Sequence, residues 1–92
     1  MAYFAIEYVY DTARGSEMDE VRPTHRAFLG SLCEAGKIIA SGPLVGEGKA
    51  LILFTADSAE DALAALDEDP FYINGFILDR IVRTWDPVIR SF

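Results

Sequence analysis

The chain has 92 residues, of which 51% are hydrophobic and 25% are charged. This composition is typical of a small globular protein and too apolar for a disordered segment, so we expect one domain over residues 1–92. Fifteen acidic against eight basic residues give a net charge of −7, and no basic stripe is present to neutralise phosphates. Nucleic acid is therefore not an expected partner.

Two further absences narrow the class of protein. No apolar run approaches the ~20 residues that are needed to cross a bilayer. The single cysteine allows no internal disulfide, and no Cys/His zinc motif is present. We therefore expect a soluble, cytoplasmic protein that makes no membrane contact.

The first predicted element is a strand over residues 2–10 (AYFAIEYVY), because this stretch is rich in aromatic and β-branched residues and ends at the polar segment 11–20. Both sides of the strand are largely apolar, which is unusual for a strand that is wetted on one face. Helical spacing begins at Val21. A helix is predicted from there to just before Gly36, with Pro23 in its first turn.

The next two predicted elements are strands, Lys37–Ser41 and Lys49–Ala56. Gly42-Pro43 is expected to stop the first strand, and a glycine-bearing loop then leads into the second. The two strands are therefore predicted to form a hairpin.

The C-terminal third is predicted to hold a second helix and a last strand. Ser58 followed by Asp61 resembles a capping box, and alanines and leucines then recur at the helical period to about Asp67. The last strand is predicted over residues 76–85 (FILDRIVRTW). The order β-α-β-β-α-β folds, in the split βαβ topology, into a four-stranded antiparallel sheet with both helices on one face. We expect a ferredoxin-like α+β domain.

Both faces of this sheet are apolar. Two helices can cover only one face, yet Leu51 and Leu53 oppose Ile52 and Phe54 in the third strand. Another apolar surface is needed to cover the second face. A second copy packed sheet to sheet is the simplest cover, so we expect a homodimer through the open sheet face.

His25 is the only histidine, and it lies within the apolar stripe of the first helix. At about 100° per residue it shares one wedge with Val21, Phe28 and Leu32. An imidazole titrates near neutral pH and can act as a general base or acid. A core histidine whose ring nitrogens are hydrogen-bonded by neighbours is the alternative, and the stripe alone leaves both open.

The segment D-E-D-P-F at residues 67–71 supplies a candidate partner for this histidine. Asp is a favoured N-cap and Pro a favoured first helical residue, so Asp69-Pro70 is also explained as the start of a helical turn. A carboxylate beside an imidazole fixes its tautomer and stabilises the imidazolium. Asp69 is therefore the candidate partner of His25, although sequence spacing alone establishes no contact.

Other residues are candidates for binding a ligand. Arg22 lies near the start of a helix, where a cation is unfavourable, so either an anionic ligand or a solvated surface position accounts for it. The stretch Ser41-Gly42-Pro43 could leave backbone N–H groups facing a ligand, although a strand-ending turn explains it equally well. Phe71 could line a pocket or fill the core. No HExxH, GxSxG or GxGxxG motif occurs, so no metal and no cofactor are expected.

Four short motifs, RPTHRAFL, EAGKIIASGPL, DEDPF and GFILDRIVRTW, occur in this order. Together they resemble the YCII-related (YciI-like) family over essentially the whole chain. The resemblance implies a ferredoxin-like fold, a dimeric α/β barrel similar to that of muconolactone isomerase, and an active site on a histidine and an aspartate, here His25 and Asp69. It also matches Arg22, Gly42 and Pro43 to motif positions, and one related member is associated with dehydrochlorination of a chlorinated hydroxyquinol.

With the resemblance included, two functions compete. The first is a small cofactor-independent lyase or isomerase in which His25 moves a proton on a small anionic or enol-like molecule and Asp69 orients the imidazole. The second is a non-catalytic ligand-binding or assembly module in which the same pair is a structural hydrogen bond. In the first, the substrate is expected to be held by Arg22, Gly42, Pro43 and Phe71.

Overall fold

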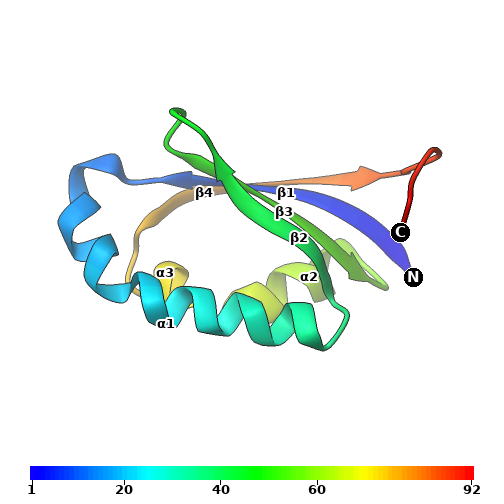
Figure 1. The fold of residues 1–92 in the computed structure, drawn as a ribbon, viewed down its shortest axis with the longest axis horizontal. Coiled ribbons are helices and arrows are strands. Elements are labelled where there is room, and N and C mark those ends of the chain that lie inside the picture. The colour runs from blue at the N-terminus through cyan, green and yellow to red at the C-terminus, as the bar shows by residue number, and fades with distance from the viewer.

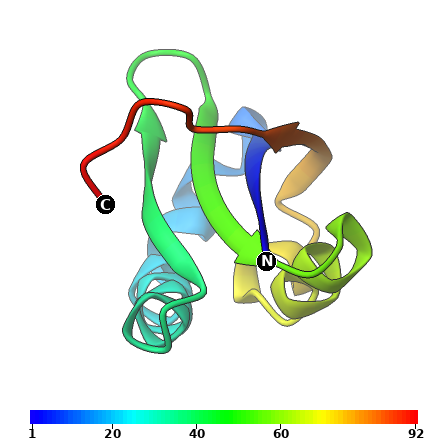
Figure 2. The same cartoon turned by 90° about the vertical axis from the view of Figure 1, so that its right-hand side faces the viewer.

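The computed structural model describes all 92 residues, and its sheet has the strand order β2-β3-β1-β4 with every neighbouring pair antiparallel. The α-helices all lie on one side of this sheet (Figures 1 and 2). This arrangement confirms the expected ferredoxin-like α+β fold. In chain order the elements are β1 (Ala2–Tyr10), η1 (Thr12–Arg14, a 3-10 helix), α1 (Gly15–Glu34), β2 (Ile38–Leu44), β3 (Lys49–Ala56), α2 (Ala59–Leu66), α3 (Pro70–Ile73) and β4 (Ile77–Trp85).

The core lies between the sheet and the helices. Residues directly opposed in a sheet share a face, and Ile6 of β1 stands opposite Ile52 of β3 and Val82 of β4. Ile6 and Ile52 are fully buried beneath the helices. The largest fully buried side chains of the chain are Tyr8, Phe54, Phe71, Ile6, Ile52, Leu66 and Asp69.

Helix α1 begins at Gly15, six residues before the predicted start. The polar segment after β1 is not a loop, because Asp11 caps η1 through its side chain and η1 runs directly into α1. The added turns bury Met18 on the same helix as His25. Pro23 therefore lies inside the helix, where it lacks the N–H that would bond to the carbonyl of Asp19. None of the helices is both long and apolar enough to span a membrane.

Strand β2 continues through Gly42-Pro43 to Leu44, so the expected stop at these residues is wrong. Gly42 pairs with Leu51 and Pro43 with Ala50. A proline is compatible with this position because β2 is an edge strand, whose outward backbone groups need no partner within the sheet.

The second face of the sheet carries no helix (Figure 2). Its side chains, among them Ala5, Leu51 and Leu53, are half-buried rather than buried. The C-terminal segment crosses this face, and the Phe92 ring meets Tyr3 edge-on at 5.7 Å between centroids. Most of this face therefore has no cover within the chain.

Candidate active site

His25 and Asp69 meet between α1 and α3. The Nδ1 atom of His25 lies 2.7 Å from the Oδ1 atom of Asp69, and the two residues are 6% and 0% exposed. They are 44 positions apart in the sequence, so only the packing of α3 against α1 brings them together.

Asp69 is also the N-cap of α3, as the Asp69-Pro70 sequence suggested. Its backbone is extended at the N-cap position, its Oδ1 atom accepts a hydrogen bond from the Phe71 N–H at 3.0 Å, and Pro70 occupies the first helical turn. The other carboxylate oxygen, Oδ2, accepts from the Tyr8 hydroxyl at 3.0 Å. Capping and contact with His25 therefore coexist in one carboxylate with three donors.

The contact with Asp69 fixes the position of one proton on the imidazole. An ionised carboxylate can only accept, so Nδ1 of His25 carries a proton and its N–H donates a hydrogen bond to Oδ1 of Asp69. The remaining nitrogen, Nε2, has no hydrogen-bond partner in the chain. Every fully buried side-chain nitrogen or oxygen of the chain has a hydrogen-bond partner. Because Nε2 has none, it is not fully buried, and it is the ring nitrogen accessible from the cavity that His25 lines, described below.

The ring of His25 is held by a second contact. It stacks on Phe71 with 3.8 Å between centroids and 3° between planes. Phe71 itself packs edge-on against Phe76 and Tyr10. Rotation of the imidazole is thus restrained by both an aromatic face and a hydrogen bond.

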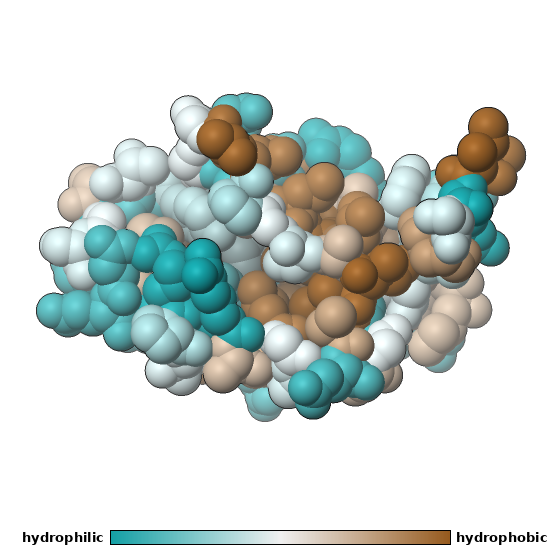
Figure 3. All heavy atoms as spheres, viewed as in Figure 1, coloured by the Kyte–Doolittle hydropathy of each residue, from teal (hydrophilic) through white to brown (hydrophobic).

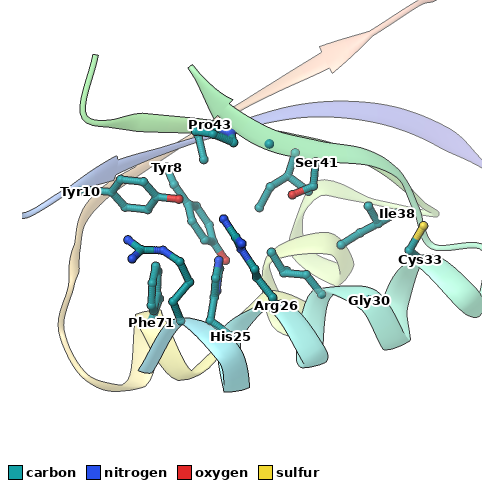
Figure 4. Close-up of a pocket in the computed structure, with 15 residues that line it drawn as sticks. Tyr8, Tyr10, His25, Arg26, Gly30, Cys33, Ile38, Ser41, Pro43 and Phe71 are labelled. Carbon is teal, nitrogen blue, oxygen red and sulfur yellow. The ribbon is translucent and has the colours of Figure 1, made fainter. Parts of the chain in front are cut away.

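The cavity has a volume of about 520 Å³ and lies between α1 and the strands β1, β2 and β3 (Figure 4). Figure 3 shows hydrophobic atoms within the hollow between β2 and α1, bordered by strongly hydrophilic atoms on the side of the N-terminal half of α1. Its lining residues are Tyr8, Tyr10, Arg22, His25, Arg26, Leu29, Gly30, Cys33, Ile38, Ser41, Gly42, Pro43, Ala50, Ile52 and Phe71.

Five of the six residues selected from the sequence line this cavity. The sixth, Asp69, lies behind His25 and has no exposed surface. Gly42 and Pro43 reach the cavity from within β2 rather than from a turn. The five predicted residues in the lining are His25, Arg22, Gly42, Pro43 and Phe71.

Sequence reasoning missed Tyr8, Tyr10 and Arg26, which also line the cavity, whereas Ser41 lies there beside Gly42 and Pro43, as the sequence suggested. Tyr8 and Tyr10 lie two residues apart on one strand, so they share a face, and a phenol on a core-facing position needs a polar partner. Arg26 lies one helical turn after Arg22, and this spacing alone places the two on the same side of α1. Both signals were present in the sequence.

The environment of the two tyrosines raises their pKa values above the ordinary value near 10. Burial, then the negative charge of Asp69 and the hydrogen bond to it, raises the pKa of Tyr8 far above its usual value. Burial and the charge of Asp69 also raise the pKa of Tyr10, against smaller lowering effects from Arg22 and Arg26. Both phenols, which are donors at neutral pH in any case, therefore resist ionisation in alkaline solution as well.

Nowhere in the chain do three or more His, Cys, Asp or Glu side chains gather in a way that could hold a metal ion. The only cysteine, Cys33, is exposed at the rim of the cavity.

Comparison with solved structures gives a match to 5-chloro-2-hydroxyhydroquinone dehydrochlorinase (TftG) from Burkholderia phenoliruptrix, in complex with 2,5-dihydroxybenzoquinone. The two chains superpose with a TM-score of 0.79 at 22% identity, over 91% of this chain and 93% of that chain, which supports a shared fold. No protein among curated sequences matches this chain. The model of the YCII-related domain matches residues 1–86, so this chain belongs to the YCII-related family.

Proposed function

We propose that this protein is a small enzyme that moves a proton on a small organic molecule, in lyase or isomerase chemistry, with His25 as the base. The observation that carries the proposal is the different surroundings of the two ring nitrogens. Nδ1 is held by a buried carboxylate at 2.7 Å, and Nε2 is left without a protein partner beside the cavity. A neutral imidazole held in this way directs its free electron pair to the place where a substrate would lie.

In the proposed reaction a proton passes from the substrate to Nε2. The resulting imidazolium keeps its Nδ1–H bond to Asp69, so the new positive charge faces a buried negative one. The substrate anion then either expels a leaving group, as in a lyase, or takes the proton back at another atom, as in an isomerase. In the lyase case the imidazolium returns its proton to solvent, and neither reaction requires a cofactor.

The similarity to TftG supports elimination as the first reaction to test. Dehydrochlorination is the loss of a proton and a chloride ion, and the name of TftG gives a hydroxylated chloro-arene as its substrate. An accessible imidazole nitrogen can accept the proton that such a reaction releases. The cavity volume of about 520 Å³ lies within the range of sites for small ligands.

The proposed substrate contacts come from the other cavity residues. Arg22 supplies a cation, and its guanidinium carbon lies 5.7 Å from the centre of the Phe71 ring. Gly42 and Pro43 form part of the opposite wall on β2. The ring of Phe71 supports the imidazole from beneath and contributes an apolar surface.

A structural role for the same pair is the competing function, and one observation favours it. Asp69 caps α3 and has no exposed surface, so its carboxylate would be needed for folding even without chemistry. On this reading the cavity belongs to a non-catalytic ligand-binding or assembly module. Loss of His25 would then leave a buried carboxylate with one donor fewer.

Turnover separates the two functions. Wild type, His25→Asn and His25→Ala are incubated in D₂O with 5-chloro-2-hydroxyhydroquinone and with a panel of small enols and keto acids, and chloride release and deuterium incorporation are followed by NMR. We expect turnover by wild type, none by His25→Asn, and a near-normal melting temperature for His25→Asn. Lys37→Gln, an exposed residue outside the cavity, is the control and keeps the wild-type rate.

Two results would contradict the enzyme. Equal rates for wild type and His25→Asn would remove His25 from the reaction. No turnover of any compound, together with a loss of about 1–3 kcal/mol in the free energy of unfolding of His25→Ala, would favour the structural role.

We also propose that the protein is a homodimer through the open sheet face. The proposal is supported by the half-buried apolar side chains of β1 and β3 on that face, which no helix covers. Sheet-to-sheet packing of two copies would bury them in a closed two-fold assembly.

A further inference from the structure

The cavity is positive in a negative protein. The chain carries a net charge of −7 with fifteen acidic residues, yet no Asp or Glu is among the residues that line the cavity. Two arginines are, Arg22 and Arg26. Their one-turn spacing on α1 places like charges side by side, which destabilises a helix unless something compensates.

Arg22 already has a partner. Its guanidinium forms an ion pair with Asp19, three residues earlier on the same helix, and lies near the face of the Phe71 ring. Part of its charge is therefore neutralised within the chain before any ligand arrives.

Arg26 has no such partner: its side chain makes neither an ion pair nor a hydrogen bond with another residue. Figure 4 shows its side chain rising from α1 into the cavity, between His25 and Ser41 and beneath Pro43. All five of its N–H donors are thus free for a ligand, beside the nitrogen that we propose as the base.

We propose that Arg26 is the main binding residue for a carboxylate group of the substrate, so that the cavity takes small, planar organic monocarboxylates. This inference deepens the proposed function, on which it rests, by naming the class of substrate. The carboxylate would be bound bidentately by the planar guanidinium, with the carbon skeleton placed over His25.

Charge and shape favour a planar monoanion. The guanidinium of Arg26, which has no partner in the chain, balances one negative charge on a ligand. A second negative charge on the ligand would be repelled by the net charge of −7 on the protein. The walls near Arg26 are the rings of Tyr8, Tyr10 and Pro43, which suit a flat carbon skeleton.

Tyr10 supplies a second donor in the same region. Figure 4 shows its ring directed into the cavity from β1. A tyrosine hydroxyl is protonated at neutral pH, and burial raises the pKa of Tyr10 further, so its O–H can donate to an oxyanion held by Arg26. The hydroxyl is neutral, so it adds a hydrogen bond to the ligand without placing a further charge in the empty cavity.

Binding of benzoate tests the proposal without any turnover. Titrations of benzoate and of its uncharged analogue benzamide are followed by NMR and calorimetry at low ionic strength, for wild type, Arg26→Gln, Arg26→Lys, Arg22→Gln and the exposed control Lys37→Gln. Arg26→Gln is expected to weaken benzoate binding by about tenfold or more, which corresponds to about 1.4 kcal/mol. Arg26→Lys should recover part of this loss because it keeps the charge but not the planar fork.

The other variants make the assignment specific. Arg22→Gln is expected to weaken benzoate binding by less than Arg26→Gln, because Asp19 already neutralises part of the Arg22 charge. Lys37→Gln, which removes the same single charge away from the cavity, leaves benzoate binding unchanged. Benzamide binds more weakly than benzoate in wild type and is insensitive to Arg26→Gln.

Three results would overturn the proposal. These are benzoate binding that Arg26→Gln does not weaken, a larger effect from Arg22→Gln, or inorganic phosphate bound more tightly than benzoate. Failure here is distinct from failure of the proposed enzyme, because the loss of turnover in His25→Asn does not depend on which residue binds the anion.

Discussion

Tyr8 and Asp69, 61 positions apart in the chain, are joined by a buried hydrogen bond of 3.0 Å. The hydroxyl donates to Oδ2, while Oδ1 of the same carboxylate is shared by His25 and the Phe71 N–H. The proposed base is thus connected to the central strand β1 through a single buried anion.

Tyr8→Phe is therefore expected to destabilise the protein. Removing the hydroxyl takes one donor from a buried ionised carboxylate, and a hydrogen bond to a charged group contributes about 1.5–3 kcal/mol. Urea denaturation measures the loss. Tyr3→Phe is the matched control because the Tyr3 hydroxyl makes no hydrogen bond in the chain, and an equal loss in both variants would contradict the role given to the Tyr8 hydroxyl.

Stability is expected to fall in alkaline solution. In the unfolded chain tyrosines ionise near pH 10, whereas burial raises the pKa values of Tyr8 and Tyr10 in the folded protein. Above about pH 10 the folded state holds more protons than the unfolded state, so the free energy of unfolding decreases as the pH rises. Well below pH 10 both states keep the two phenols protonated, so the stability does not change with pH through these groups.

Tyr10→Phe isolates one of these groups. Between about pH 9 and 11 this variant should lose less stability than wild type, because it no longer has a phenol that ionises only on unfolding. Urea midpoints at several pH values provide the measurement. Parallel curves for the two proteins would show that Tyr10 contributes nothing to the alkaline loss.

Asp69→Asn is expected to remove the negative charge beside His25 while keeping the N-cap of α3. Asparagine is also a favoured N-cap, so α3 should still begin at Pro70, but the imidazolium formed in the reaction would no longer face a negative charge. Turnover should fall by about 100-fold or more, while Asp69→Ala loses both turnover and stability. Initial rates and urea denaturation of both variants provide the comparison, and undiminished turnover in Asp69→Asn would place Asp69 outside the reaction.

Leu53→Lys is expected to dissociate the proposed homodimer. Leu53 pairs with Ala5 and Ala40 on the face of the sheet that no helix covers. A charge there would be buried without a partner in a sheet-to-sheet interface. Light scattering after size exclusion should give twice the monomer mass for wild type and the monomer mass for the variant. Ala27→Lys, on the exposed side of α1, adds the same charge and should remain dimeric.

Strand and helix types were predictable because hydrophobic periodicity is a local signal. The limits of β1 and β3 match the predicted ranges, since both segments are continuous runs of apolar, aromatic and β-branched residues that end at polar residues. The start of α1 was missed because its first turns are polar apart from Met18, whose burial depends on tertiary packing. The end of β2 was missed because proline is compatible with a strand only at the edge of a sheet. The local sequence does not show that β2 is an edge strand, since this depends on the order of the strands in the folded sheet.

The candidate site was predictable in residue type more than in arrangement. His25 stood out as a titratable group on an apolar stripe, and Asp69 as a cap in the D-E-D-P-F segment. Their contact depends on α3 packing against α1, which no local pattern specifies. Tyr8 was missed because it was taken for ordinary core, although its hydroxyl requires a polar partner there; only the fold shows that this partner is Asp69.

The shortness of α3 ties the proposed chemistry to a local folding step. A helix of four residues does not persist by itself in water, so α3 forms when Phe71 packs onto His25 and Asp69 closes its first turn. Undocking of this one turn would take away the carboxylate and the stacked ring together while most of the sheet stayed intact. Amide exchange at Phe71 and the NMR signals of the His25 ring should therefore report the same opening equilibrium.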